Sequence, residues 1–144
     1  MPNVLFQELG FPIVLVDPPM VEVRGHPVLD VNMKELQEVV FRQLVFKPSR
    51  FTGAEVRFIR KYLRMRQADL ARILHMANHS AVSQWESRED EGTGMQYNTE
   101  VVLRVWMAAR LGLTDGPLDL LESGLRDLRP ASDGPLQVVL PRAA

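Results

Sequence analysis

The sequence of 144 residues contains no cysteine and only three histidines, His26, His75 and His79. A chain without thiols forms no disulfide and no thiolate zinc site, and three scattered histidines lack the spacing of metal ligands. No apolar run approaches the length of a membrane span, and the N-terminus lacks the basic and apolar segments of a secretory signal. We therefore expect a cytoplasmic protein without a bound metal or other cofactor.

Catalytic motifs are also missing. The only adjacent acids, Glu89-Asp90-Glu91, lie in a segment that contains glycines, whereas a catalytic carboxylate pair needs opposed and partly buried acids. The sequence has no Gly-rich phosphate-binding loop and no Ser/His/Asp arrangement. These absences predict a protein that is not an enzyme.

Charge is distributed unevenly along the chain. Between Lys47 and Arg88 there are nine basic and three acidic residues, a net of +6, whereas the rest has eight basic and fifteen acidic residues, a net of −7. A basic block within an acidic chain suits a module that binds a polyanion, with attached parts that do not. A solvated helical face is the commoner origin of such a cluster, so charge alone leaves both interpretations open.

The first 46 residues predict a small β-sheet followed by a helix. Asn32 and Glu35 have capping-box spacing, and the apolar residues after them recur at helical spacing, so a helix is predicted over 33–46. Pro48 cannot continue that helix, and the segment 47–50 is the predicted domain boundary. Short Val- and Ile-rich runs between turn residues predict three strands, at 11–16, 20–24 and 28–29.

Three short helices are predicted between residues 52 and 88. Thr52 and Glu55 have the spacing of a second capping box, and Asn78 is a favoured N-cap residue. Apolar residues recur at helical spacing in each segment. The helices are predicted from Thr52 to Met65, from Gln67 to Leu74, and from Asn78 through Glu86.

The C-terminal third predicts a helix over 98–111, closed by Gly112, and a shorter helix over 117–128. Residues 136–140 predict a strand that joins the N-terminal sheet. The resulting division has three parts: an N-terminal region over 1–46, a middle domain over 47–112, and a C-terminal helix and tail over 113–144.

The segment 67–86 has the residue types that a helix-turn-helix needs. In such a unit the second helix enters the major groove and the first crosses the phosphate backbone. Ala71 supplies the small residue where the two helices touch, and Trp85 is predicted to be buried. Further apolar residues across the turn are Leu70, Leu74, Met76 and Val82, and polar residues near the start of the second helix are His79, Ser80, Ser83 and Gln84.

Two segments carry a family resemblance. Gln67-Ala68-Asp69-Leu70-Ala71, followed by Val82-Ser83-Gln84-Trp85-Glu86, resembles the signature of the Xre/Cro/C1 family. The run from Phe51 to Lys61, with the part from Gly10 through the predicted helix 33–46, is similar to MqsA-type antitoxins in a zinc-free variant.

Three positions depart from the usual family pattern. Arg66 replaces the Ser or Thr cap, and Arg64 replaces a terminal Gly. The turn over 75–78 is one residue longer than is usual, with Ala77 as the insertion.

The resemblance implies a mainly α fold: a lambda-repressor-like helix-turn-helix bundle with a small N-terminal β-sheet plus helix, in the α+β class. It implies a sequence-specific DNA-binding repressor that binds a palindromic operator as a homodimer. It further implies the antitoxin of a type II toxin-antitoxin system, which autoregulates its operon and neutralises a partner toxin. Two alternatives stay open: a stand-alone Xre-type regulator without a toxin, and a protein-interaction adaptor that has lost DNA binding.

Candidate site residues follow from this reading. Arg57, Arg60 and Lys61 either form a solvated face or contact phosphates. Val102, Val105, Trp106 and Ala109 either pack within the chain or form a dimer seam, which is the favoured reading. The residues expected to contact DNA are Arg66, Gln67, Asn78, His79, Ser80, Ser83, Gln84 and Arg88.

Overall fold

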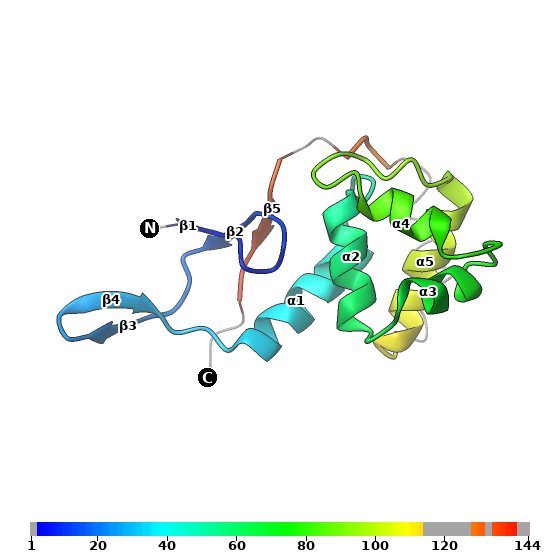
Figure 1. Ribbon diagram of the computed structural model, residues 1–144. Helices are drawn as coiled ribbons and strands as arrows, with labels where there is room; N and C mark the ends of the chain where they lie inside the picture. Colours follow the sequence, from blue (N-terminus) through cyan, green and yellow to red (C-terminus); the bar gives the residue numbers. More distant parts are fainter. Residues whose placement is uncertain (1–2, 114–127, 132–133, 141–144) are drawn as a thin grey trace. The chain divides into compact units, whose positions relative to one another are not determined.

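The computed structural model describes residues 3–113, 128–131 and 134–140, and these residues form an α+β structure (Figure 1). They divide into two compact units. The first comprises the described residues of Met1–Val40 and Gly134–Ala144, and the second those of Phe41–Asp133. Within these residues, no helix combines the length and apolar character needed to cross a lipid bilayer.

The first unit contains a three-stranded sheet of β1 (Asn3–Phe6), β2 (Ile13–Val16) and β5 (Leu136–Val138), in the order β1-β2-β5. β1 runs antiparallel to β2, and β5 runs parallel to it. Ile13 and Leu15 point to one face of the central strand and are fully buried. The predicted C-terminal strand is thus confirmed as β5, whereas β1 was not predicted.

A separate two-stranded sheet pairs β3 (Met20–Val23) with β4 (His26–Leu29). The two residues between the strands, Arg24 and Gly25, have φ angles of 52° and 79°. Positive φ at both central residues is the type I′ geometry, whose twist matches that of the flanking strands. This hairpin confirms the two predicted strands with different bounds: Arg24, predicted in the first strand, lies in the turn, and the second strand begins at His26 and not at Val28.

Helix α1 (Met33–Val45) begins where the sequence predicted, because the backbone N–H of Glu35 donates to Oδ1 of Asn32 at 3.1 Å. Its last turns belong to the second unit: the ring of Phe41 stacks on Tyr62 with centroids 4.4 Å apart. Pro48 follows the helix without ending this packed unit. The second unit therefore begins before the segment 47–50 at which the sequence predicts a boundary.

Four more helices of the second unit are described: α2 (Gly53–Tyr62), α3 (Gln67–Ile73), α4 (Ser80–Glu86) and α5 (Tyr97–Arg110). They confirm the three short helices and the helix over 98–111. The predicted helix over 117–128 falls outside the described residues except for Leu128. The core between the four helices includes the fully buried side chains of Val56, Ile59, Leu70, Val82, Leu103 and Met107.

The capping box at the start of α2 is formed as predicted. The backbone N–H of Glu55 donates to the hydroxyl of Thr52 at 3.2 Å, and the backbone N–H of Thr52 donates to the Glu55 carboxylate at 2.8 Å. Each residue thereby satisfies a backbone donor that the helix leaves without a partner.

Candidate nucleic-acid interface

Helix α4 has one buried face and one exposed polar face. Val82, Trp85 and Glu86 are buried, and α4 packs against both α2 and α3. Val82 and Trp85 lie three positions apart, as inward residues of a helix should. The opposite face consists of the exposed residues Ser80, Ser83, Gln84 and Ser87.

The turn before α4 presents the start of that polar face. Oδ1 of Asn78 accepts a hydrogen bond from the backbone N–H of Ser80 at 2.8 Å. His79 already has helical dihedral angles, φ −72° and ψ −10°. The N-cap of α4 is the exposed His79, whose carbonyl accepts from the N–H of Ser83 at 3.0 Å. The sequence placed the cap one residue earlier, at Asn78, whose side chain satisfies the N–H of Ser80.

Helices α2 and α3 end in the same way, although neither ends in glycine. Arg64 and His75 adopt left-handed conformations with φ of 57° and 58°. After Arg64, the N–H of Met65 donates to the carbonyl of Arg60 at 3.1 Å, and after His75 that of Met76 donates to Ala71 at 2.8 Å. Both are Schellman motifs, which usually place glycine at the left-handed position.

Replacing Arg64 or His75 with glycine should stabilise the protein, each by about 1 kcal/mol, because the left-handed region strains any side chain with a Cβ atom. Chemical denaturation of each variant measures the free energy of unfolding. Ala68→Gly, in the first turn of α3, is the control: it relieves no left-handed strain and should cost up to about 1 kcal/mol. A loss of stability in all three variants would contradict this account.

The start of α3 carries two of the predicted contact residues. Arg66 is exposed over 79% of its side chain and pairs with Asp69 at 3.1 Å. Hydrogen bonds from the Arg66 guanidinium and then from the Arg66 backbone N–H lower the pKa of Asp69 to about 2. Arg66 has no acceptor for a cap, so the Asp69 carboxylate alone caps this end, by accepting from the Arg66 N–H at 2.9 Å.

Glu86 connects three helices through its buried carboxylate. Its two oxygens accept from Nε and a terminal nitrogen of Arg60 on α2, at 2.7 and 3.0 Å. Nε2 of Gln67, at the start of α3, lies 3.3 Å from the same carboxylate. Gln67 is therefore held by α4 and is only partly exposed.

Arg57 and Arg60 are hydrogen-bonded to other residues of the chain, whereas a phosphate contact requires a free guanidinium group. The Arg57 guanidinium donates to the carbonyl of Glu86 at 2.9 Å, at the C-terminal end of α4, and pairs with Glu89 at 2.8 Å. The hydrogen bond to Glu89 raises the pKa of Arg57 and lowers that of Glu89. The side chain of Arg60 is only 14% exposed. The structure assigns both arginines to holding α4 against α2.

The basic block is thus partly neutralised from within. Lys47 and Arg50 pair with the buried carboxylates of Glu55 and Glu100, at 2.6 and 2.9 Å. Within the block from Lys47 to Arg88, three exposed basic residues have no ion pair with any other described residue: Lys61, Arg64 and Arg88.

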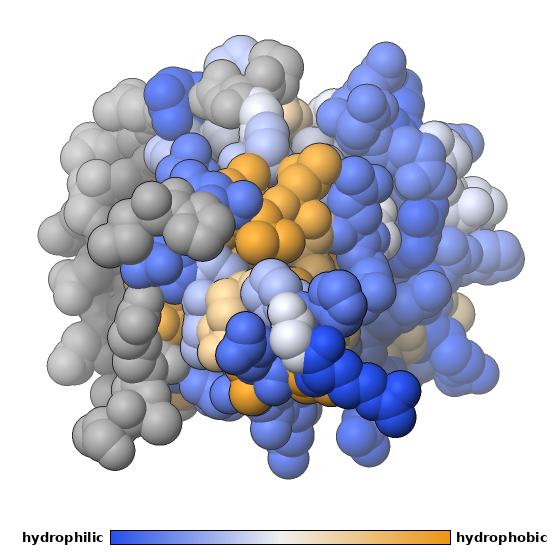
Figure 2. Space-filling view, turned by 90° about the vertical axis from the view of Figure 1, so that its left-hand side faces the viewer, coloured by the Kyte–Doolittle hydropathy of each residue, from blue (hydrophilic) through white to orange (hydrophobic). Residues whose placement is uncertain are grey.

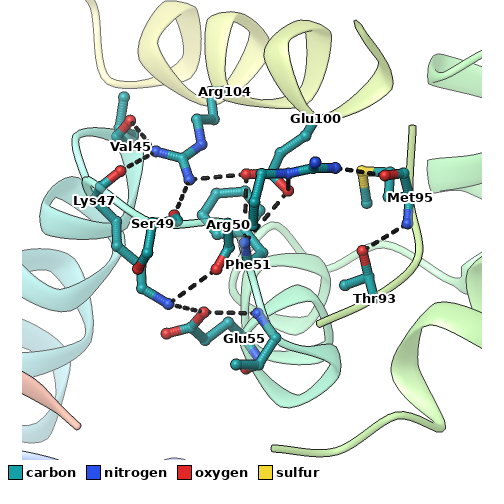
Figure 3. Close-up of polar contacts among 11 residues, drawn as sticks. Val45, Lys47, Ser49, Arg50, Phe51, Glu55, Thr93, Met95, Glu100 and Arg104 are labelled. Atoms are coloured by element: carbon teal, nitrogen blue, oxygen red, sulfur yellow. Dashed lines mark hydrogen bonds and ion pairs between the residues drawn. The ribbon is translucent and has the colours of Figure 1, made fainter. Parts of the chain in front are cut away.

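A buried charge network holds the segment 45–51 against α5 (Figure 3). The fully buried guanidinium of Arg104 donates to the carbonyls of Lys47 and Ser49 at 2.5 and 2.6 Å, and to the Glu100 carboxylate at 2.8 Å. Burial lowers the pKa of Arg104, and the Glu100 charge opposes that shift. The sequence analysis did not predict the ion pair of Glu100 and Arg104. The signal that could have indicated it is a Glu and an Arg one helical turn apart, beside the apolar Leu103.

The predicted dimer seam lies on the outer face of α5. Val102 is 49% exposed and Ala109 is exposed, whereas Val105 and Trp106 are partly exposed. These four residues follow the spacing of a single helical stripe. Arg110 lies over the Trp106 ring, 5.4 Å from its centroid. The structure therefore brings the four residues together on the side away from the buried Leu103, Met107 and Ala108.

Comparison with known proteins adds no relative: no protein family, no curated protein and no solved structure matches the chain. Among the residues that the structure describes, no group of three or more His, Cys, Asp or Glu is placed to hold a metal ion.

Proposed function

We propose that the protein is a sequence-specific DNA-binding repressor in which α3 and α4 form a helix-turn-helix. The observation that carries the proposal is the two-faced α4: Val82 and Trp85 anchor it, and its exposed side offers short hydroxyl and amide side chains. Side chains of this kind donate to and accept from base edges in the major groove. The sequence similarity to the Xre/Cro/C1 signature supports the same assignment.

One set of residues would contact bases and determine sequence specificity, and another set would contact phosphates and supply affinity. Ser83 and Gln84 on α4 face outward and are proposed to contact bases, with His79 and Ser80 nearer the turn. Lys61, Arg64, Arg66 and Arg88 are exposed cations that suit the phosphate backbone, which supplies most of the salt-dependent affinity. Gln67 has a second N–H besides the one aimed at Glu86, and this donor suits a phosphate oxygen.

Assembly as a homodimer completes the proposal. A single small helix-turn-helix covers one half-site, and two half-sites about 34–36 Å apart give a palindromic operator. The apolar stripe of Val102, Val105, Trp106 and Ala109 is the proposed seam. The role of antitoxin in the cytoplasm rests on the resemblance to MqsA-type proteins, and the separate first unit is the part available to a toxin.

The experiment begins by selecting duplexes from a random DNA library with the purified chain. On the selected site, Gln84→Ala and Ser83→Ala should each weaken binding by about 1–3 kcal/mol if the lost contact is a good bidentate one. Gln67→Ala removes a proposed phosphate contact and should weaken binding to every sequence alike. Gln37→Ala is the control, because Gln37 is exposed on α1 in the first unit. Fluorescence anisotropy titrations measure each affinity. Equal affinities across all four variants would contradict the docking of α4.

The phosphate contacts are tested separately by salt dependence. Lys61→Ala, Arg64→Ala and Arg88→Ala should weaken binding to every sequence alike, and each should reduce the slope of log K against log salt by about 1. If a variant changes the sequence preference and leaves the salt slope unchanged, the substituted residue contacts a base and not a phosphate.

The antitoxin role needs its own test. Co-purification of the chain with the product of an adjacent gene, and rescue of growth when that product is expressed, would support it. A neighbouring product that neither binds the chain nor arrests growth would leave a stand-alone repressor.

A further inference from the structure

The β3–β4 hairpin exposes apolar side chains on one face. Val21 lies opposite Val28, and Val23 lies opposite His26, so the three valines share that face. Val21, Val23 and Val28 are 44%, 49% and 44% exposed. Figure 2 shows, on the side of the molecule that it presents, apolar residues in orange among hydrophilic ones. A two-stranded sheet on its own is marginally stable in water, which makes further pairing favourable.

The two edges of this hairpin differ in hydrogen-bonding capacity. The N–H of Asp30 donates to the carbonyl of Pro19 at 2.9 Å, so the pair 19 and 30 is a bonded one. Bonded and non-bonded pairs alternate along an antiparallel ladder, which directs the N–H and C=O groups of Met20 and Glu22 away from β4. On the other edge the same alternation directs Pro27 outward, and proline has no N–H.

The outer edge of β3 therefore offers both N–H and C=O groups to a further strand, whereas the outer edge of β4 lacks the N–H at Pro27. Every residue of β3 is exposed. Natural proteins usually protect such an edge, because it is a template for another strand.

We propose that β3 pairs antiparallel with β3 of a second copy of this chain, with Val21 on the two-fold axis. Met20 of each chain then exchanges backbone hydrogen bonds with Glu22 of the other. The valines of the four strands form one continuous row, in the order 28, 21, 21 and 28, on a shared face. Such an interface is self-complementary and closes on itself, as a two-fold interface must.

The chemistry of β3 selects this register over the next two registers toward the turn. An axis at Glu22 would place two carboxylates directly opposite each other, which destabilises a sheet. An axis at Val23 would require Arg24 to pair as a strand residue, although its φ of 52° places it in the turn. The register at Val21 avoids both conflicts. This surface lies in the first unit, so it is a second self-association site in addition to the proposed α5 seam.

The absence of cysteine from the chain allows a direct test by single-cysteine cross-linking. Across the axis, Val21 faces its own copy in a non-bonded pair, with Cα atoms about 4.5 Å apart, which a disulfide spans. Val23→Cys on the same face is the matched control, because its two copies would lie about 14 Å apart along the strands. Oxidation of the full-length chain without DNA should yield covalent dimer for Val21→Cys and little for Val23→Cys.

A pair of variants at Glu22 tests the backbone hydrogen bonds. Added to Val21→Cys, Glu22→Pro should abolish the cross-link because it removes an outward N–H, whereas Glu22→Ala should preserve it. Circular dichroism confirms that each variant is folded. The proposal is overturned if Val21→Cys does not cross-link, if Val23→Cys cross-links equally well, or if a folded Glu22→Pro variant behaves like Glu22→Ala. None of these results depends on operator binding, so the proposed function stands or falls separately.

Discussion

Replacing Gly53 with alanine is expected to destabilise the protein by about 3 kcal/mol, at the upper end of the cost of overpacking. A Cβ atom on Gly53 would lie 2.9 Å from the carbonyl oxygen of Glu86 and 2.8 Å from the backbone nitrogen of Glu89, and would also meet the carbonyl oxygen of Trp85. All three are backbone atoms, which cannot move aside as a flexible side chain can. The start of α2 must therefore separate from the end of α4.

Equilibrium unfolding in urea, followed by the fluorescence of the two tryptophans, the buried Trp85 and the partly exposed Trp106, measures this effect. Gly92→Ala is the matched control, because its added Cβ would lie 3.5 Å from the Ala131 side chain, an ordinary contact. That variant should change stability by no more than about 0.5 kcal/mol. Because α4 carries the proposed base contacts, Gly53→Ala should also weaken operator binding under conditions in which it is still folded. Equal stabilities of the two variants would refute this account of the α2–α4 contact.

Replacing Arg104 with methionine is expected to cost about 3–5 kcal/mol of stability, because it leaves the charge of Glu100 and several carbonyls buried with fewer donors. The guanidinium bonds the carbonyls of Val45, Lys47 and Ser49 and lies 4.3 Å above the Phe51 ring. Arg104 therefore connects α5 to three carbonyls at the end of α1 and in the segment that follows it.

The variant Arg104→Lys tests whether the positive charge is enough to stabilise the network or whether the planar shape of the guanidinium is also needed. An ammonium group keeps the charge but cannot reproduce the planar fork that reaches several acceptors at once, so most of the loss should persist. Arg110→Met on the same helix is the control, because Arg110 is exposed and should cost less than about 1 kcal/mol. Thermal and chemical denaturation both report the difference. Full stability of Arg104→Lys would show that charge alone supports the network.

The sequence by itself determined the features that depend on neighbouring residues. Thr52 with Glu55, and Asn78 before α4, predicted helix starts because caps act within one turn. Helical spacing placed Val82 and Trp85 inside, and alternation with turn residues placed β3 and β4. These signals come from residues close together in the sequence, so they can be recognised without knowledge of the rest of the fold.

Only the tertiary structure decided what distant residues do to one another. Arg57 and Arg60 look the same in the sequence whether they face solvent or pair with Glu89 and Glu86, which lie 32 and 26 residues away along the chain. The burial of Arg104 is likewise visible only once the segment 45–49 lies against α5. An ion pair forms between residues that are close in space, whereas a sequence pattern indicates only where residues lie along a single helix or strand.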